Sequence, residues 1–132
     1  MQVKIGDTFS VSKVMSDAVV RAFAELSGDY NPIHLDDEFA KNTRFGSRIA
    51  HGMLSGALLS AVLGNEFRER KIVYVSQSMR FVAPVFIGDE VTATATVKSI
   101  RDDKPLVTIE TTCTNQNGGV TLTGEAVVLI LD

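Results

Sequence analysis

Both histidines of this 132-residue chain lie in one stretch, beside residues that could carry out proton transfer. Asp29 and His34 are five residues apart, and Asn31-Pro32 between them bends the chain, so the two side chains can converge on one point. A carboxylate and an imidazole around one water molecule can remove a proton from it and deliver another to a substrate. Asp is also common in turns, and a loop histidine is often only a partly exposed surface residue. The spacing alone leaves both interpretations open.

A second candidate feature lies at His51-Gly52-Met53, where an apolar, helix-like run begins. A glycine at the start of a helix leaves a backbone N–H group at the positive end of the helix dipole. Such a group suits a developing oxyanion, for instance the carbonyl oxygen of a thioester. Alternatively, Gly52 only allows close packing against a neighbouring sheet.

The basic residues near this loop and the single cysteine are weaker candidates for a functional role. Lys41, Arg44 and Arg48 flank the loop and could meet a phosphate-bearing cofactor, but isolated basic residues are more often solvated surface charges. Cys113 lies on the apolar side of a predicted strand, so we expect a core thiol and not a nucleophile. One cysteine and two histidines provide few soft ligands, so we expect no metal site.

The composition excludes several classes of protein. Thirteen Lys and Arg against sixteen Asp and Glu give a net charge of -3 with no basic block, which argues against a nucleic-acid partner. The length predicts one domain over residues 1–132. The N-terminal stretch lacks the apolar core of a signal peptide, and the apolar run from 49 to 64 is shorter than the roughly 20 residues that a bilayer requires. We therefore expect a cytoplasmic protein with no membrane partner.

The first half of the sequence predicts the elements that position these residues. After a short strand over residues 8–14, Ser16 is a good N-cap for a helix that ends at Gly28. A short helix is expected over 36–41. The long apolar helix then runs from about 51 to 65.

The second half changes to a period of two residues. Strands are predicted over 72–82, 91–97, 106–114 and 120–131. Short turns between them indicate an antiparallel meander of four strands in sequence order. In the first strand Val73, Val75, Met79 and Phe81 should share one face. One face of such a sheet must be covered, and the 51–65 helix is the apolar cover available, so the fold class is α+β.

The stretch from Ser27 to Leu63 resembles the signature of the MaoC-like hot-dog proteins, and specifically of the (R)-specific enoyl-CoA hydratases. It contains Asp-x-Asn-Pro-x-His, then Phe-Ala and Phe-Gly in the loop, then Ile-Ala-His-Gly-Met at the start of the helix. The later stretch RFVAPVFIGDEV is also similar to the aromatic, Pro-Val and Gly-Asp segment of that family. The resemblance covers nearly the whole chain.

The resemblance implies a hot-dog fold, in which a curved antiparallel sheet wraps a long central helix. It implies that Asp29 and His34 are the catalytic pair, that the Gly52 N–H receives the thioester carbonyl, and that Ser60 supports the pair. It assigns no chemical role to His51. It further implies a homodimer that adds water to trans-2-enoyl-CoA to give (R)-3-hydroxyacyl-CoA, with no metal or other cofactor beyond the coenzyme A of the substrate.

Two other functions fit the same fold. A hot-dog acyl-CoA thioesterase usually relies on an acidic residue on or near the central helix, and the 51–65 run contains none. A non-catalytic acyl-CoA-binding module has no need for Asp29 and His34 together.

Overall fold

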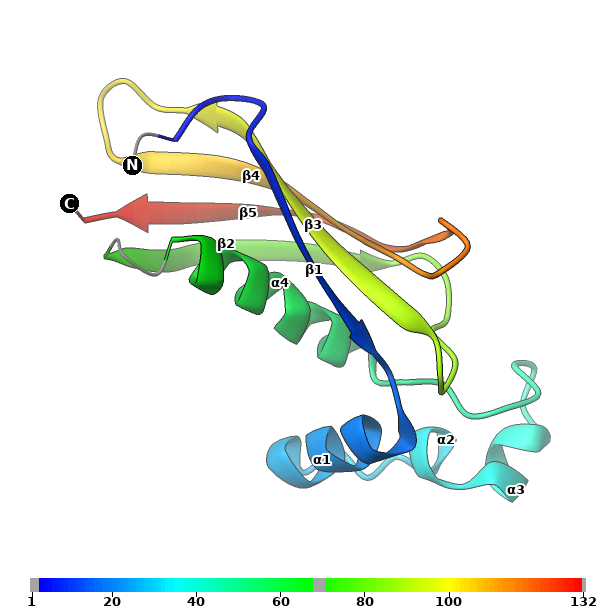
Figure 1. Cartoon of the computed structure of the whole chain (residues 1–132). Coiled ribbons are helices and arrows are strands. Elements are labelled where there is room, and N and C mark those ends of the chain that lie inside the picture. Colours follow the sequence, from blue (N-terminus) through cyan, green and yellow to red (C-terminus); the bar gives the residue numbers. More distant parts are fainter. Residues whose placement is uncertain (1–2, 68–70, 132) are drawn as a thin grey trace.

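The computed structural model describes residues 3–67 and 71–131. In this part of the chain the strands form one five-stranded antiparallel sheet in the order β1-β3-β4-β5-β2. A helix, α4 (Gly52–Glu66), lies against one face of the curved sheet (Figure 1). The predicted α+β hot-dog architecture is confirmed. The strands are β1 (Thr8–Val14), β2 (Ile72–Phe81), β3 (Glu90–Ile100), β4 (Leu106–Thr114) and β5 (Val120–Ile130).

The core forms between α4 and the inner face of the sheet. The β3 strand shows the alternation read from its sequence, because every second side chain from Val91 to Val97 is at most 1% exposed. Each buried Val or Leu contributes roughly 1.5–3 kcal/mol through burial. These contacts fix α4 on the sheet and thereby fix its N-terminus. The main core residues are Leu54, Leu58, Leu59, Val62 and Leu63 of α4, and Val91, Ala93, Ala95 and Val97 of β3.

The predicted order of the meander is wrong for one strand. Strands β3, β4 and β5 pair in sequence order, but β2 pairs with β5 at the edge and not with β3. The reason is that β1 already occupies the other side of β3, with Thr8 opposite Thr96. The chain therefore crosses from β2 to β3 through residues 82–89, and this crossing brings that segment next to the start of α4.

The predicted face of β2 is also wrong. The register of β2 against β5 shifts between Tyr74 and Ser76, as in a β-bulge. One extra residue reverses the alternation, so Met79 and Phe81 are on the face opposite to that of Val73. Val73 and Val75 are 46% and 56% exposed.

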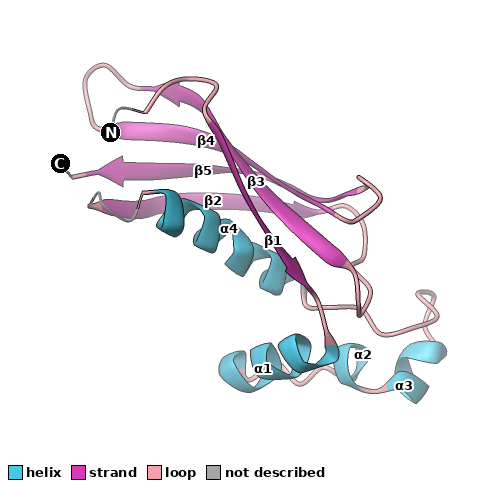
Figure 2. Ribbon diagram, in the orientation of Figure 1, coloured by secondary structure: helices cyan, strands magenta, loops and turns pink. Residues whose placement is uncertain are grey.

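The helices of the first half gather beyond the end of the sheet, where α4 begins (Figure 2). In α1 (Asp17–Ser27) the Ser16 side chain accepts a hydrogen bond from Val19 N–H, and Gly28 ends the helix with φ of 80°. These two predictions are confirmed, as is α3 (Asp37–Lys41). Among the described residues, no helix combines the length and apolar character needed to cross a membrane.

A helix that was not predicted, α2 (Pro32–Leu35), carries His34. Asn31 is its N-cap, and the Asn31 side chain accepts a hydrogen bond from Ile33 N–H at 3.2 Å. Pro32 occupies the first turn, where its missing N–H group and fixed φ cost nothing. The Asn-Pro pair therefore begins a helix and does not only bend the chain.

Candidate active site

His34 is buried and held from its backbone and from its ring. Its ring Nδ1 lies 2.7 Å from the carbonyl oxygen of Ile49, in the segment that leads into α4. The backbone N–H of Ile49 donates in turn to the carbonyl of Ile33, at 3.3 Å. These two hydrogen bonds fasten α2 to the start of α4.

The bond to Ile49 determines the tautomer of His34. A carbonyl oxygen only accepts hydrogen bonds, so Nδ1 carries the proton and Nε2 presents a lone pair. Burial lowers the pKa of His34 below its ordinary value of 6.5, and the neighbouring His51 ring lowers it further. The bond to Ile49 and the charge of Asp29 oppose this shift in pKa. The site therefore presents a neutral imidazole with Nε2 as the proton acceptor.

Asp29 is exposed, in the tight loop between α1 and α2. Its N–H donates to Ser27 Oγ at 3.1 Å, and its Oδ1 accepts the N–H of Asn31 at 3.2 Å. The other carboxylate oxygen, Oδ2, accepts no hydrogen bond from the residues that the structure describes. Asp29 can therefore stabilise the turn through Oδ1 and still take part in chemistry through Oδ2.

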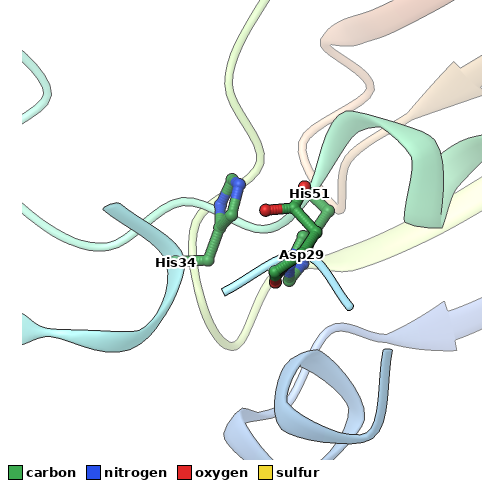
Figure 3. A group of neighbouring side chains, drawn as sticks. All are labelled: Asp29, His34 and His51. Carbon is green, nitrogen blue, oxygen red and sulfur yellow. Dashed lines mark hydrogen bonds between the residues drawn. The ribbon is translucent and has the colours of Figure 1, made fainter. Parts of the chain in front are cut away.

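The fold brings Asp29, His34 and His51 together (Figure 3). Their nearest oxygen and nitrogen atoms all lie within 4.8 Å of one another. His34 Nδ1 and His51 Nε2 both point at backbone carbonyls, which leaves the other nitrogen of each ring outside these bonds. The two rings also face each other, with centroids 3.9 Å apart. A carboxylate and an imidazole placed in this way can take up and deliver a proton, and the absence of a metal site stays a prediction.

Gly52 is the first residue of α4, and the His51 side chain makes no capping hydrogen bond to this helix. The N–H groups of the first turn are therefore left without a side-chain cap. A Cβ atom at position 52 would lie 2.8 Å from the Phe81 ring. Glycine therefore lets the Phe81 ring pack closely at this position, and the two interpretations of Gly52 are compatible with each other.

A cavity of about 400 Å³ adjoins this helix start. Its lining includes His34, Gly52 and Ser55, together with residues 81–85 and Thr121 and Leu122 of β5. Neither Asp29 nor Ser60 lines the cavity within the described structure. Ser60 is exposed, eight residues or roughly 12 Å along α4 from Gly52 at 1.5 Å per residue. One chain therefore does not bring Ser60 to the pair, and its supporting role stays a prediction.

The three basic residues have different environments. Lys41 is exposed, and Arg44 lines the cavity with its guanidinium 5.0 Å from the centre of the Phe45 ring. Arg48 is buried, so the expectation of a solvated charge is wrong for it. Its Nε donates to the His34 carbonyl at 2.8 Å and its Nη2 to Asp17 at 2.6 Å. This residue braces the helix that carries His34.

Cys113 is a buried thiol in the core, as predicted. Burial raises the pKa of the Cys113 thiol to about 11. The thiolate needed for nucleophilic attack is therefore scarce at neutral pH.

This chain is similar to a known protein family, to individual proteins and to solved structures. The model of the MaoC like domain matches residues 2–118. The chain belongs to the MaoC-like family. This MaoC-like chain is 46% identical over 125 residues to the (R)-specific enoyl-CoA hydratase of Aeromonas caviae, covering 95% of this chain and 93% of that protein. It is 41% identical to the 3-hydroxybutyryl-CoA dehydratase of Methylorubrum extorquens, covering 96% of this chain and 80% of the relative.

The fold agrees with the same group of proteins. The solved structure of an (R)-hydratase from A. caviae involved in PHA biosynthesis superposes on the MaoC-like chain with a TM-score of 0.92. Their sequences are 45% identical, and the match covers 96% of each chain. The resemblance found in the loop and helix signature is confirmed.

Several features of this MaoC-like site were not predicted from the sequence. The burial of Arg48 depends on Asp17, 31 residues earlier, and local spacing carries no indication of that contact. The cavity wall at 81–85 depends on the crossing between β2 and β3. The helical start at Asn31-Pro32 did have a local indication, because Asn is a favoured N-cap and Pro a favoured first residue.

Proposed function

We propose that this protein catalyses the reversible addition of water to trans-2-enoyl-CoA, giving (R)-3-hydroxyacyl-CoA. The observation that carries the proposal is the convergence of Asp29 and His34 beside a cavity that begins at Gly52. Sequence identity of 46% to a relative named as such a hydratase supports the substrate and the stereochemistry.

Asp29 and His34 act on one water molecule in this mechanism. His34 Nε2 and the free carboxylate oxygen of Asp29 both accept, so they can hold the two O–H groups of a water between them. As the water oxygen bonds to C3 of the substrate, the pair takes up one water proton. The pair then delivers a proton to C2, so the reaction consumes no net proton.

Gly52 stabilises the negative charge that passes through the thioester. Addition at C3 forms an enolate, whose charge resides mainly on the carbonyl oxygen. The Gly52 N–H, at the uncapped positive end of α4, can donate to that oxygen. Removing such a donor typically lowers the rate on the order of 100-fold or more.

The residues present supply all the groups that this reaction needs. A carboxylate, a neutral imidazole and a backbone N–H account for each proton and charge, so we propose that no metal or redox cofactor takes part. The acyl group of the substrate is proposed to occupy the cavity, whose lining is mostly apolar, and Arg44 at its wall is available to a phosphate of coenzyme A.

We also propose that the protein is a cytoplasmic homodimer built from one domain over 1–132. An α-helix that is apolar on all sides needs partners on all sides, yet Met53, Ala57, Ser60 and Gly64 form an exposed stripe along α4. The β2 strand, at one edge of the sheet, also has an unpaired side in the single chain among the described strands. A second copy of the chain would cover both surfaces. Sedimentation at micromolar concentration should give a dimer, and a stable monomer would contradict this proposal.

Crotonyl-CoA tests the function against its alternatives. Hydration removes the conjugated enoyl absorbance and releases no free thiol, which is the expected result. Release of free thiol would instead indicate a thioesterase. No change in either signal would indicate a binding module. Chiral analysis of the product should give the (R) form, and mainly (S) product would contradict the stereochemical proposal.

A further inference from the structure

His51 occupies a position where helix chemistry favours a different residue. It is the N-cap of α4, with φ of -58° and ψ of 132°, but its side chain does not cap the helix. Ser, Thr, Asp and Asn are favoured at this position because their side chains accept from the first turn. A residue that breaks such a local preference is often retained for function.

The His51 side chain reaches the Asp29 loop instead. Its Nε2 lies 3.1 Å from the backbone carbonyl oxygen of Asp29, 22 residues earlier. The carbonyl can only accept, so Nε2 carries the proton and donates it. The remaining ring nitrogen, Nδ1, is buried without a hydrogen-bond partner among the described residues.

The His51 ring also sets the position of His34. His51 is only 2% exposed, and its ring contacts the rings of both Phe23 and His34. Its centroid is 4.9 Å from that of Phe23 and 3.9 Å from that of His34. The ring of His34 is thus limited on one face by His51, while its Nδ1 is held by Ile49.

We propose that His51 is a positioning residue that holds Asp29 and His34 in the geometry needed to share one water. Its Nε2–H fixes the backbone of the exposed Asp29 loop, and its ring fixes the plane of His34. His51 itself exchanges no proton with the substrate. This inference rests on the proposed hydratase function of the same site.

A purely structural role for His51 makes a different prediction. If the ring only fills the core, then another aromatic ring should serve as well, and activity should follow thermal stability. If the Nε2–H donor matters, a side chain that keeps the donor without the ring should be the better catalyst. His51→Phe keeps the ring and removes the donor, whereas His51→Gln places an amide N–H near the position of Nε2.

The experiment measures kcat and KM for crotonyl-CoA, together with melting temperature, in the wild type, His51→Phe and His51→Gln. We expect His51→Phe to lower kcat roughly 10- to 100-fold with KM within about threefold, because misplacing a reacting group by about 1 Å has effects of this size. His51→Gln should keep kcat within about tenfold of the wild type and exceed His51→Phe, although the phenylalanine variant should be at least as stable.

A kcat of His51→Phe equal to or above that of His51→Gln would overturn the inference. If His51→Phe does not fold, His51→Asn replaces it, since its amide is one methylene too short to reach the Asp29 carbonyl. The same order, Gln above Asn, is then expected, and equal kcat values would overturn the inference. Activity of the wild type shows whether a negative result concerns the hydratase function or only the role of His51. A folded wild type that does not hydrate crotonyl-CoA defeats the proposed function, whereas a normal wild type with fully active His51→Phe defeats only the role of His51.

Discussion

His34 shows how its surroundings can prepare a single residue for chemistry. The donated bond from Nδ1 to Ile49 leaves Nε2 as the acceptor, and burial favours the uncharged ring. A free histidine could adopt either tautomer and would be partly protonated near pH 6.5. The fold therefore selects the tautomer and favours the neutral form of His34 before the substrate binds.

The pH dependence of kcat/KM follows from the lowered pKa of His34. Because the folded protein holds this ring neutral to a pH below its ordinary pKa of about 6.5, the active form persists as the pH falls through 6.5. We expect the acid limb of the pH profile of kcat/KM for crotonyl-CoA to have its midpoint below pH 6.5. A midpoint above pH 6.5, with the protein still folded, would contradict the neutral-acceptor role.

Gly52 offers a second test at the residue scale. An added Cβ would lie 2.8 Å from the Phe81 ring, so the ring or the helix start must move. We expect Gly52→Ala to reduce kcat/KM by roughly tenfold or more, since the N–H donor and the cavity wall are both displaced. Full activity of Gly52→Ala would refute the need for this close approach.

The elements differ in how far their sequences reveal them. The alternation of β3 is visible in VTATATV, because every second residue must face α4. The bulge in β2 is not visible, since a strand with Val at 73 and 75 gives no sign that one residue will be left out of register. Asp29 and His34 could be named as candidates from residue type and spacing, but it was the resemblance to the MaoC-like family that favoured them over the structural interpretation. The role of Arg48 could not be predicted in this way, because burial of its charge depends on a contact with α1 across 31 residues.

Arg48 connects two helices beside the site, α1 and α2, so its loss should reduce both stability and catalysis. It donates to the His34 carbonyl and to Asp17, and its pairing is the first cause of the lowered pKa of Asp17. Arg48→Met should lower the free energy of unfolding by about 1–3 kcal/mol, the range for losing hydrogen bonds to charged groups. We also expect kcat to fall, because α2 loses its brace.

Arg21 provides the control for this prediction. It pairs with the same Asp17 carboxylate at 3.0 Å, but its side chain is 53% exposed. Exposed pairs of this kind contribute about 0–1 kcal/mol. In urea unfolding, Arg48→Met should therefore lose clearly more stability than Arg21→Met. Equal losses of stability would show that Arg48 is not a structural brace.

At the scale of the whole molecule, the sheet and α4 serve mainly to hold a loop against a helix start. The core side chains of α4 and β3 fix where Gly52 lies, and the crossing from β2 to β3 supplies part of the cavity lining. The small helices then carry the Asp29 loop and His34 to that point. The reactive groups come from one stretch of the chain, but part of the cavity lining comes from residues 81–85 and β5, so the complete site exists only in the folded protein.

Kinetic coupling between Asp29 and His34 tests the central claim most directly. The measurement is kcat for crotonyl-CoA in Asp29→Asn, His34→Ala and the double variant, with melting temperatures to show that each protein is folded. If the pair acts on one water, each single variant should lose roughly 100-fold or more in kcat with little change in KM. The double variant should then be scarcely worse than the poorer single variant, because groups that act as a unit are not additive. Near-normal turnover by folded Asp29→Asn, or losses that multiply in the double variant, would contradict the mechanism.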